Sequence, residues 1–253
     1  MEHVLAMTGI VVGLVVVALG ALLLNGRRRR RSASGEEARD GTADYLTMMV
    51  GVLYALVLGV ALVTVWESKD DASTNISAEA GALHQMYLLA DALPPDTAQQ
   101  ARSATEAYAV YVRNEEWPLM EQGKPLGPRG WALLRDVQNA WTSFEPATNV
   151  QQQVDQVAFA QLSAAYQARH GREEAAGQGM SGVMWFGLLA GGALTLGLMF
   201  LFGVERTGTH LVLATGFTCL IVFMVVLIYE LNSPFGGLLG LSSAPFAGVA
   251  VGV

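Results

Sequence analysis

The chain has 253 residues, of which 52% are hydrophobic and 15% are charged, and its formal net charge is −7. This composition excludes an ordinary soluble domain and indicates a polytopic membrane protein. The single cysteine, Cys219, excludes disulfide bonds within the chain, so any domain in water must be held together by its own core.

The first apolar run, Val4 to Leu24, is long enough to cross a bilayer as a helix. Its positive charges follow the apolar residues and no A-x-A cleavage site ends it, so we expect a retained anchor and not a signal peptide. We therefore predict transmembrane helix 1 over residues 1–24.

Residues 25–44 form a short polar loop that contains an arginine run. The adjacent arginines are Arg27, Arg28, Arg29, Arg30 and Arg31. Short loops rich in arginine stay in the cytoplasm, which predicts a cytoplasmic basic loop and an external amino terminus. The same arginines could bind anionic lipid headgroups, and this alternative stays open.

The run over residues 45–66 contains no charged residue and covers about 30 Å as a helix, which predicts transmembrane helix 2. Gly51, Ala55 and Gly59 lie four residues apart on one face, a pattern typical of helices that pack closely in membranes. Apolar residues at helical spacing continue beyond this run. The same helix is therefore expected to project into water.

Residues 67–181 contain 15 Asp and Glu against 8 Lys and Arg, so this segment carries the net charge of the chain. Three breaks divide it into four helices: Leu93-Pro94-Pro95, Trp117-Pro118 with the Gly and Pro loop to Pro128, and Glu145-Pro146. The short connections predict an extracytoplasmic four-helix bundle, continuous with spans two and three. Such an acidic surface attracts cations, although solubility alone can also explain it.

Two further apolar runs predict transmembrane helices 3 and 4, over residues 182–203 and 210–230, joined by a cytoplasmic turn at 204–209. The tail, 231–253, is rich in Gly, Pro and Phe and is too broken to span again. We expect it outside, along the outer membrane interface. The small residues expected at helix contacts in span three are Gly187 and Gly191.

Four carboxylates are candidate residues of an ion pathway. Glu67 and Glu230 each end a span on the outer side, so both are expected at similar depth. In a symmetric oligomer they could form a ring that selects cations at a pore mouth, and Asp70 and Asp71 could extend it. The competing interpretation is that all four are simply the first hydrated residues beyond the lipid.

Enzyme signatures are missing from the sequence: it contains no G-x-S-x-G, P-loop, H-E-x-x-H or dinucleotide-binding glycine motif. We therefore predict no catalytic residue, no cofactor and no metal site. His84 and His170 are single and have no ligand-like spacing. Glu115 and Glu116, beside Trp117, are interpreted as part of a turn that packs the indole on the bundle.

Several short pieces of the chain, in order, resemble the bacterial bestrophin-like membrane domain family, a family of unknown function. The pieces are Gly51-Val52-Leu53-Tyr54-Ala55, Val65-Trp66-Glu67, Asp71-Ala72, Glu79-Ala80, Glu115-Glu116-Trp117-Pro118, Phe202-Gly203, Ser233-Pro234-Phe235-Gly236-Gly237 and Pro245-Phe246. The family name implies kinship with bestrophins, which are pentameric anion channels with a pore lined by the second span. Kinship would place the helical bulk in the cytoplasm, whereas the arginine loop predicts it outside. Bestrophins also ring the pore with phenylalanines, whereas span two here has Tyr54 and no Phe.

Two functional hypotheses follow for a multi-pass protein of the bacterial plasma membrane with both termini outside. The first is a homo-oligomeric ion channel with an acidic external vestibule. The second is a non-conducting sensor or scaffold whose external helical domain binds a ligand or an envelope partner. The expected partners are the lipid bilayer, further copies of the chain, and ions or an envelope protein. Nucleic acid is not expected, because topology already explains the arginine run.

Overall fold

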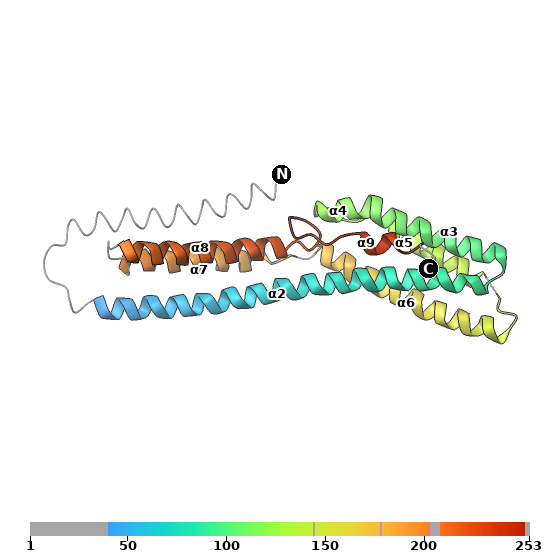
Figure 1. Ribbon diagram of the computed structural model, residues 1–253, viewed down its shortest axis with the longest axis horizontal. Helices are drawn as coiled ribbons and strands as arrows, with labels where there is room; N and C mark the ends of the chain where they lie inside the picture. The colour runs from blue at the N-terminus through green and yellow to red at the C-terminus, as the bar shows by residue number, and fades with distance from the viewer. Residues whose placement is uncertain (1–39, 144, 178, 203–207, 251–253) are drawn as a thin grey trace. The chain divides into compact units, whose positions relative to one another are not determined.

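The computed structural model describes residues 40–143, 145–177, 179–202 and 208–250 (Figure 1). The predicted first span (1–24), the arginine run (27–31) and most of the predicted turn at 204–209 lie outside the described residues.

The described residues are helical and contain no strand, which confirms the all-α prediction for this part of the chain. The helices and helical turns, in order, are α2 (Asp40–Leu89), η1 (Ala90–Ala92), α3 (Pro95–Tyr111), η2 (Val112–Glu116), α4 (Trp117–Glu121), α5 (Arg129–Thr142), α6 (Asn149–Gly177), α7 (Gly182–Phe202), α8 (Gly208–Leu231) and α9 (Ala244–Ala247).

The chain divides into two compact units. The membrane unit contains the residues up to Trp66 together with Met180–Asn232. The helical unit contains Glu67–Gly179 and Ser233–Val253. Helix α2 contributes residues to both units.

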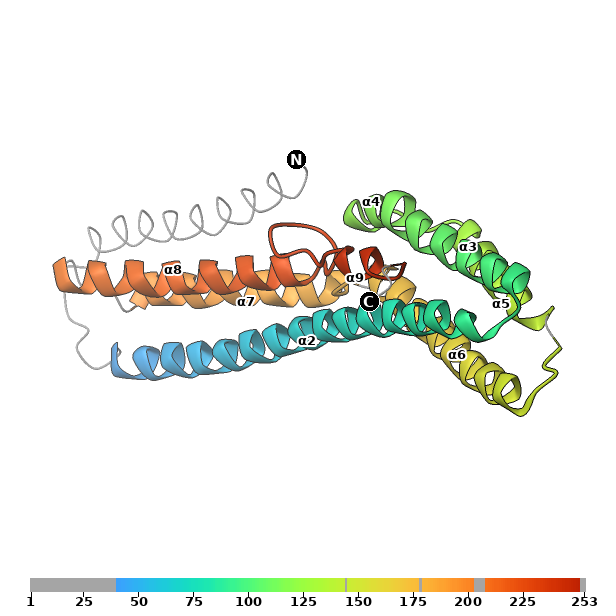
Figure 2. The same ribbon diagram turned by 45° about the vertical axis from the view of Figure 1, so that its right-hand side comes forward.

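Three described helices are long and apolar enough to cross a membrane: Tyr45–Ala92, Gly182–Phe200 and Val212–Leu231. All three contribute to the core of the membrane unit. Helices α7 and α8 lie side by side in both ribbon views (Figures 1 and 2). At one end of this pair the rings of Trp185 and Tyr229 meet edge to face with centroids 6.0 Å apart, and the Met180 amide donates to Asn232 Oδ1 at 2.6 Å.

Helix α2 is 50 residues long because nothing in its sequence interrupts it. It contains no proline, and the first proline pair, Pro94-Pro95, follows directly after the turn η1. Along its second half the buried residues Ala72, Ile76 and Leu83 recur at helical spacing and pack in the core of the helical unit.

The helical unit differs from the predicted bundle at Pro118. A break was expected from there through the loop to Pro128, but the helical path continues from α3 through η2 into α4, and Pro118 lies in the first turn of α4. The loop to Pro128 does separate α4 from α5. Proline is tolerated at position 118 because the π-helical turn before it has already changed the pairing, with the Trp117 amide donating to the Val112 carbonyl five residues back. The turn η2 is π-helical, so it carries one more residue than an α-helical turn.

The carboxyl-terminal tail contributes side chains to the core of the helical unit, which was not foreseen. Phe235, Phe246 and Val249 are buried in the core of the helical unit, and Phe235 and Phe246 both lie edge-on against Trp117. Part of the tail is therefore a core-forming segment, because its aromatic side chains bury apolar surface inside the unit. Its expected position along the membrane interface stays a prediction.

Candidate functional site

Five buried side chains form a closed ring of hydrogen bonds and ion pairs inside the helical unit, which we call the buried ring. Its members are Glu79, Tyr108, Glu116, Arg169 and Arg172. Both arginines and both glutamates are 0% exposed, so no member of these two pairs reaches water. The ring therefore holds its four charges at the centre of the unit.

Each arginine binds one glutamate through two nitrogens. Arg172 donates from Nε to Glu79 Oε2 at 2.6 Å and from Nη2 to Glu79 Oε1 at 3.0 Å. Arg169 donates from Nη1 and Nη2 to the two oxygens of Glu116 at 2.9 and 2.7 Å. A further bond from Arg172 Nη2 to Glu116 Oε2, 3.1 Å long, joins the two pairs. This fork-to-fork geometry is the strongest that arginine makes with a carboxylate.

Tyr108 closes the ring on the other side. Its hydroxyl donates to Glu79 Oε1 and accepts from Arg169 Nη1 at 2.8 Å. Burial, and then the nearby Glu79 charge, hold the pKa of Tyr108 well above its usual value, so the phenol stays neutral and keeps its proton for Glu79. With two positive and two negative charges, the ring is electrically neutral.

The charges of the ring are held in their ionised forms by each other. Burial alone would raise the pKa of Glu116, but the hydrogen bonds from Arg169 and the charge of Arg172 outweigh it and lower that pKa. Burial likewise acts to lower the pKa of Arg172, but the charge and hydrogen bonds of Glu79 outweigh it and raise that pKa. Ionised, paired carboxylates and guanidiniums are thus the stable state.

The π-helical turn η2 brings Glu116 to the ring. Tyr108 and Glu116 are eight residues apart, which in a regular α-helix would leave them about 80° apart around the axis. One α-turn followed by one wider π-turn contains about eight residues, so both side chains fall on the same face.

Gly130 on α5 makes room for the Glu116–Arg169 pair. A Cβ atom at this position would lie 2.0 Å from Glu116 Oε1 and 2.2 Å from Arg169 Nη2. Only glycine therefore lets α5 approach. The next residue, Trp131, places its ring 4.8 Å from the Arg169 guanidinium carbon, and Phe246 of the tail covers Arg172 at 5.6 Å.

Sequence reasoning missed the ring, although a signal for it exists. Arg169 and Arg172 follow Leu162 and Ala165 at spacings of four and three, which places both arginines on the apolar face of α6. A charged residue in register with a buried face predicts a buried partner. The interpretation that Trp117 packs on the bundle is borne out, since this indole is 5% exposed, but the role of Glu116 was not foreseen.

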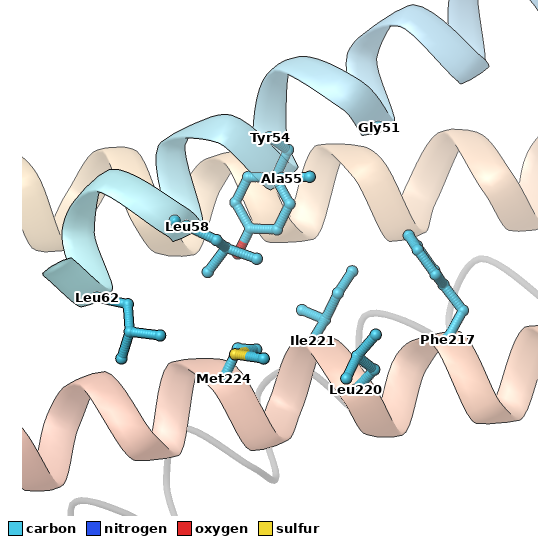
Figure 3. Close-up of a pocket in the computed structure, with 10 residues that line it drawn as sticks. Gly51, Tyr54, Ala55, Leu58, Leu62, Phe217, Leu220, Ile221 and Met224 are labelled. Atoms are coloured by element: carbon cyan, nitrogen blue, oxygen red, sulfur yellow. The ribbon is translucent and has the colours of Figure 1, made fainter.

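The membrane unit contains a second feature, an apolar groove of about 230 Å³ between α2 and α8. Figure 3 shows Tyr54 and Leu58 of α2 pointing toward Ile221 and Met224 of α8. The Tyr54 hydroxyl is buried and has no hydrogen-bond partner among the described residues. The remaining residues that line the groove are Gly51, Ala55, Gly59, Leu62, Phe217 and Leu220.

The predicted helix-packing residues fall into two groups. Gly191 of α7 lies against α2, because a Cβ atom there would be 2.9 Å from Cδ2 of Tyr54. No such neighbour lies within 4 Å of a Cβ atom at Gly51, Gly59 or Gly187, and Ala55 is exposed. The small-residue face of α2 therefore borders the groove instead of packing on a described helix.

Three of the predicted ion-pathway residues lie in the middle of α2, and the fourth lies near the end of α8. Glu67, Asp70 and Asp71 are exposed and share one face of α2, opposite the face that contains the buried Ala72. Glu230 is half-buried in the last turn of α8 and belongs to the other unit. Within the described residues, no group of three or more His, Cys, Asp or Glu side chains could hold a metal ion.

A helical chain with several membrane-length apolar helices and a separate helical unit is a polytopic membrane protein. More specifically, the chain belongs to the bestrophin-like family, because the model of the Bestrophin-like domain matches residues 12–246. No curated protein matches the chain.

The fold is similar to that of a solved bacterial bestrophin homolog. The crystal structure of a point mutant of this homolog from Klebsiella pneumoniae matches with a TM-score of 0.68 at 14% sequence identity, over 96% of each chain. The short pieces that carry the sequence resemblance also gain a structural meaning. Two of their residues, Glu79 and Glu116, belong to the buried ring. Three others form an aromatic cluster that meets the ring where Phe246 lies against Arg172: Trp117, Phe235 and Phe246.

Proposed function

We propose that the protein is an ion channel formed by several copies of the chain. Family membership over residues 12–246 is the observation that carries this proposal, and the similarity of fold to a bestrophin homolog supports it. The buried ring has the chemistry of a structural core, since its charges are paired and out of reach of water. The conducting path is therefore expected among the membrane helices.

The groove between α2 and α8 supports the oligomeric part of the proposal. Gly51 and Gly59 leave an open, small-residue face, and neighbouring copies could pack there because small residues allow close contact where lipid supplies no hydrophobic drive. Among the described residues the Tyr54 hydroxyl has no hydrogen-bond partner in this apolar setting, which is unfavourable, and a neighbouring copy could supply one.

We further propose that the channel prefers cations. Glu67, Asp70 and Asp71 are exposed carboxylates in the first turns of α2 beyond Trp66, and the charge of residues 67–181 is strongly acidic. Carboxylates repeated by symmetry around an axis raise the local concentration of cations and exclude anions. Glu230, at the end of α8, could add to this ring. The positive-inside rule supports the proposal that the acidic residues and both termini lie outside the cell.

Recordings from purified protein in planar bilayers under a KCl gradient test the proposal. We expect a current whose reversal potential lies toward that of K⁺, and a shift toward zero in Glu67→Gln. Glu145→Gln is the matched control, because Glu145 is equally exposed but lies in the loop between α5 and α6. A reversal potential toward Cl⁻ would reject cation preference, and the absence of current under every gradient would reject the channel.

A non-conducting sensor is the second candidate, and the continuity of α2 favours it. One uninterrupted helix contains both Tyr54 of the membrane unit and Glu79 of the buried ring. An event at the helical unit could thus shift the membrane part of α2. This candidate predicts no current. It also predicts that a cysteine introduced at exposed Val52 is labelled at a different rate when an antibody fragment is bound to the helical unit. An unchanged labelling rate would remove it.

A further inference from the structure

The segment that follows α8 contains a closed loop, Ser233–Leu241, with its own hydrogen bonds. The Gly236 amide donates to the Ser233 carbonyl at 3.2 Å, and the Leu241 amide donates to the Pro234 carbonyl at 2.9 Å. Gly240 lies so close to the other side of the loop that a Cβ atom there would be 2.7 Å from the carbonyl oxygen of Phe235. The loop therefore has a defined conformation that its own hydrogen bonds and close packing hold.

Its two ends point into the protein and its tip points out. Phe235 is buried against Trp117, with ring centroids 5.5 Å apart, and Leu241 packs on the same core. At the tip, Leu238 is 85% exposed and Leu239 is 44% exposed. Gly237, which precedes them, adopts a φ of +76°, a left-handed conformation that favours glycine. The backbone thus holds two adjacent leucine side chains outward.

The tip lies next to the point where α2 leaves its apolar run. Lys69 Nζ donates a hydrogen bond to the Leu239 carbonyl. Lys69 follows Trp66 by three residues on a continuous helix, a rise of about 5 Å. The loop also begins two residues after the end of α8 at Leu231. The hydrogen bond from Lys69 and the short connection to α8 therefore tie the leucines to residues that closely follow two apolar helices.

We propose that Leu238 and Leu239 insert into the interfacial region of the bilayer and anchor the helical unit to the lipid surface. Burial of apolar side chains a few ångströms into the headgroup and acyl boundary is favourable, and exposed leucines on a rigid loop pay little ordering entropy to reach it. The exposed indole of Trp66 belongs to the same level and is typical of interfacial anchors.

The single native cysteine makes a direct test possible. In a Cys219→Ser background, Leu238→Cys carries an environment-sensitive fluorophore, and the protein is reconstituted into phosphatidylcholine and phosphatidylglycerol vesicles. We expect a blue shift of the emission relative to detergent-free loop peptide, and stronger quenching by lipids spin-labelled near the headgroup than by lipids labelled at the chain end.

Val150→Cys is the matched control, because Val150 is also strongly exposed but lies in the first turn of α6, at the end of that helix remote from α7. Lys69→Ala, combined with Leu238→Cys, should reduce the lipid quenching. Emission and quenching equal to those at position 150 would overturn the proposal. A blue shift without lipid quenching would also overturn it, since it would indicate a contact with a second copy of the chain.

Discussion

Arg172 is the residue on which most of the buried ring depends. It binds Glu79 through two nitrogens and also reaches Glu116, and it is 0% exposed. Replacing a buried ion pair as a whole can be neutral, but removing one partner leaves an uncompensated charge away from water. The ring therefore gives specificity to the fold, because any arrangement that separates its members is heavily penalised.

Arg172→Met should lower the free energy of unfolding of the helical unit by about 3–5 kcal/mol, because two carboxylates lose a common partner. Denaturant unfolding followed by near-ultraviolet circular dichroism measures the change. Arg135→Met, on an exposed position of α5, removes the same charge and should have little effect. Equal losses in the two variants would contradict a structural role for the ring.

The stability of the helical unit should fall in acid because of Glu116. Its pKa in the folded protein lies below the ordinary carboxyl value, despite the opposing effect of burial. The stabilisation is therefore present above the unfolded pKa of about 4.3 and is lost as the pH falls through the lower folded pKa. Unfolding free energies measured downward from about pH 5 should decline less steeply in Glu116→Gln than in the unmodified protein. Parallel slopes would exclude Glu116 as the titrating group.

At the scale of elements, the approach of α5 to the ring depends on Gly130. Gly130→Ala must displace either Glu116 or Arg169, since its Cβ would lie within 2.2 Å of both side chains. We expect a loss of about 1–3 kcal/mol in unfolding free energy. Gly127→Ala adds the same methyl group where no atom lies within 4 Å and should be near neutral. Similar thermal midpoints for the two variants would show that α5 can retreat without cost.

The helices that follow simple periodicity could be predicted from the sequence, and the segments that depend on tertiary contacts could not. The long helix through Trp66 follows from an apolar run with no interruption. The break expected at Pro118 did not occur there, because the π-helical turn before it accommodates the proline without ending the helical path. The core contacts of the tail could not be predicted, because Phe235 and Phe246 are buried by residues far away in the sequence.

The candidate site was harder to predict than the helices. Local patterns identify charges near the ends of spans, such as Glu67, but pairing between Glu79 on α2 and Arg172 on α6 joins residues 93 positions apart. No local rule specifies that partner. The sequence shows that Arg169 lies on the apolar face of α6. Its partner could not be inferred, because the position of Glu116 depends on the π-helical turn.

At the scale of the whole molecule, two considerations disagree about which side of the membrane the helical unit lies on. The arginine run at 27–31 predicts that residues 67–181 are outside the cell, whereas kinship with bestrophins implies a cytoplasmic helical bulk. We retain the external orientation as a proposal, because an arginine-rich hairpin is costly to translocate.

Labelling of intact cells with a membrane-impermeant thiol reagent decides the orientation. In a Cys219→Ser background, Pro125→Cys, in the exposed loop between α4 and α5, should be labelled without permeabilisation. Ser34→Cys, in the predicted basic loop, should be labelled only after permeabilisation. The reverse pattern would place the acidic surface in the cytoplasm and would remove the external vestibule from the proposed channel.

The wide turn at Val112–Glu116 has a consequence for which changes this chain can accept. Arg113, Asn114 and Glu115 are exposed, so their identities can be exchanged freely. The number of residues in the turn cannot change. Deletion or insertion of one residue would rotate the following helix by about 100° and move Glu116 away from its guanidinium partners. Among relatives, the amino acids in this stretch should therefore vary while the number of residues stays the same.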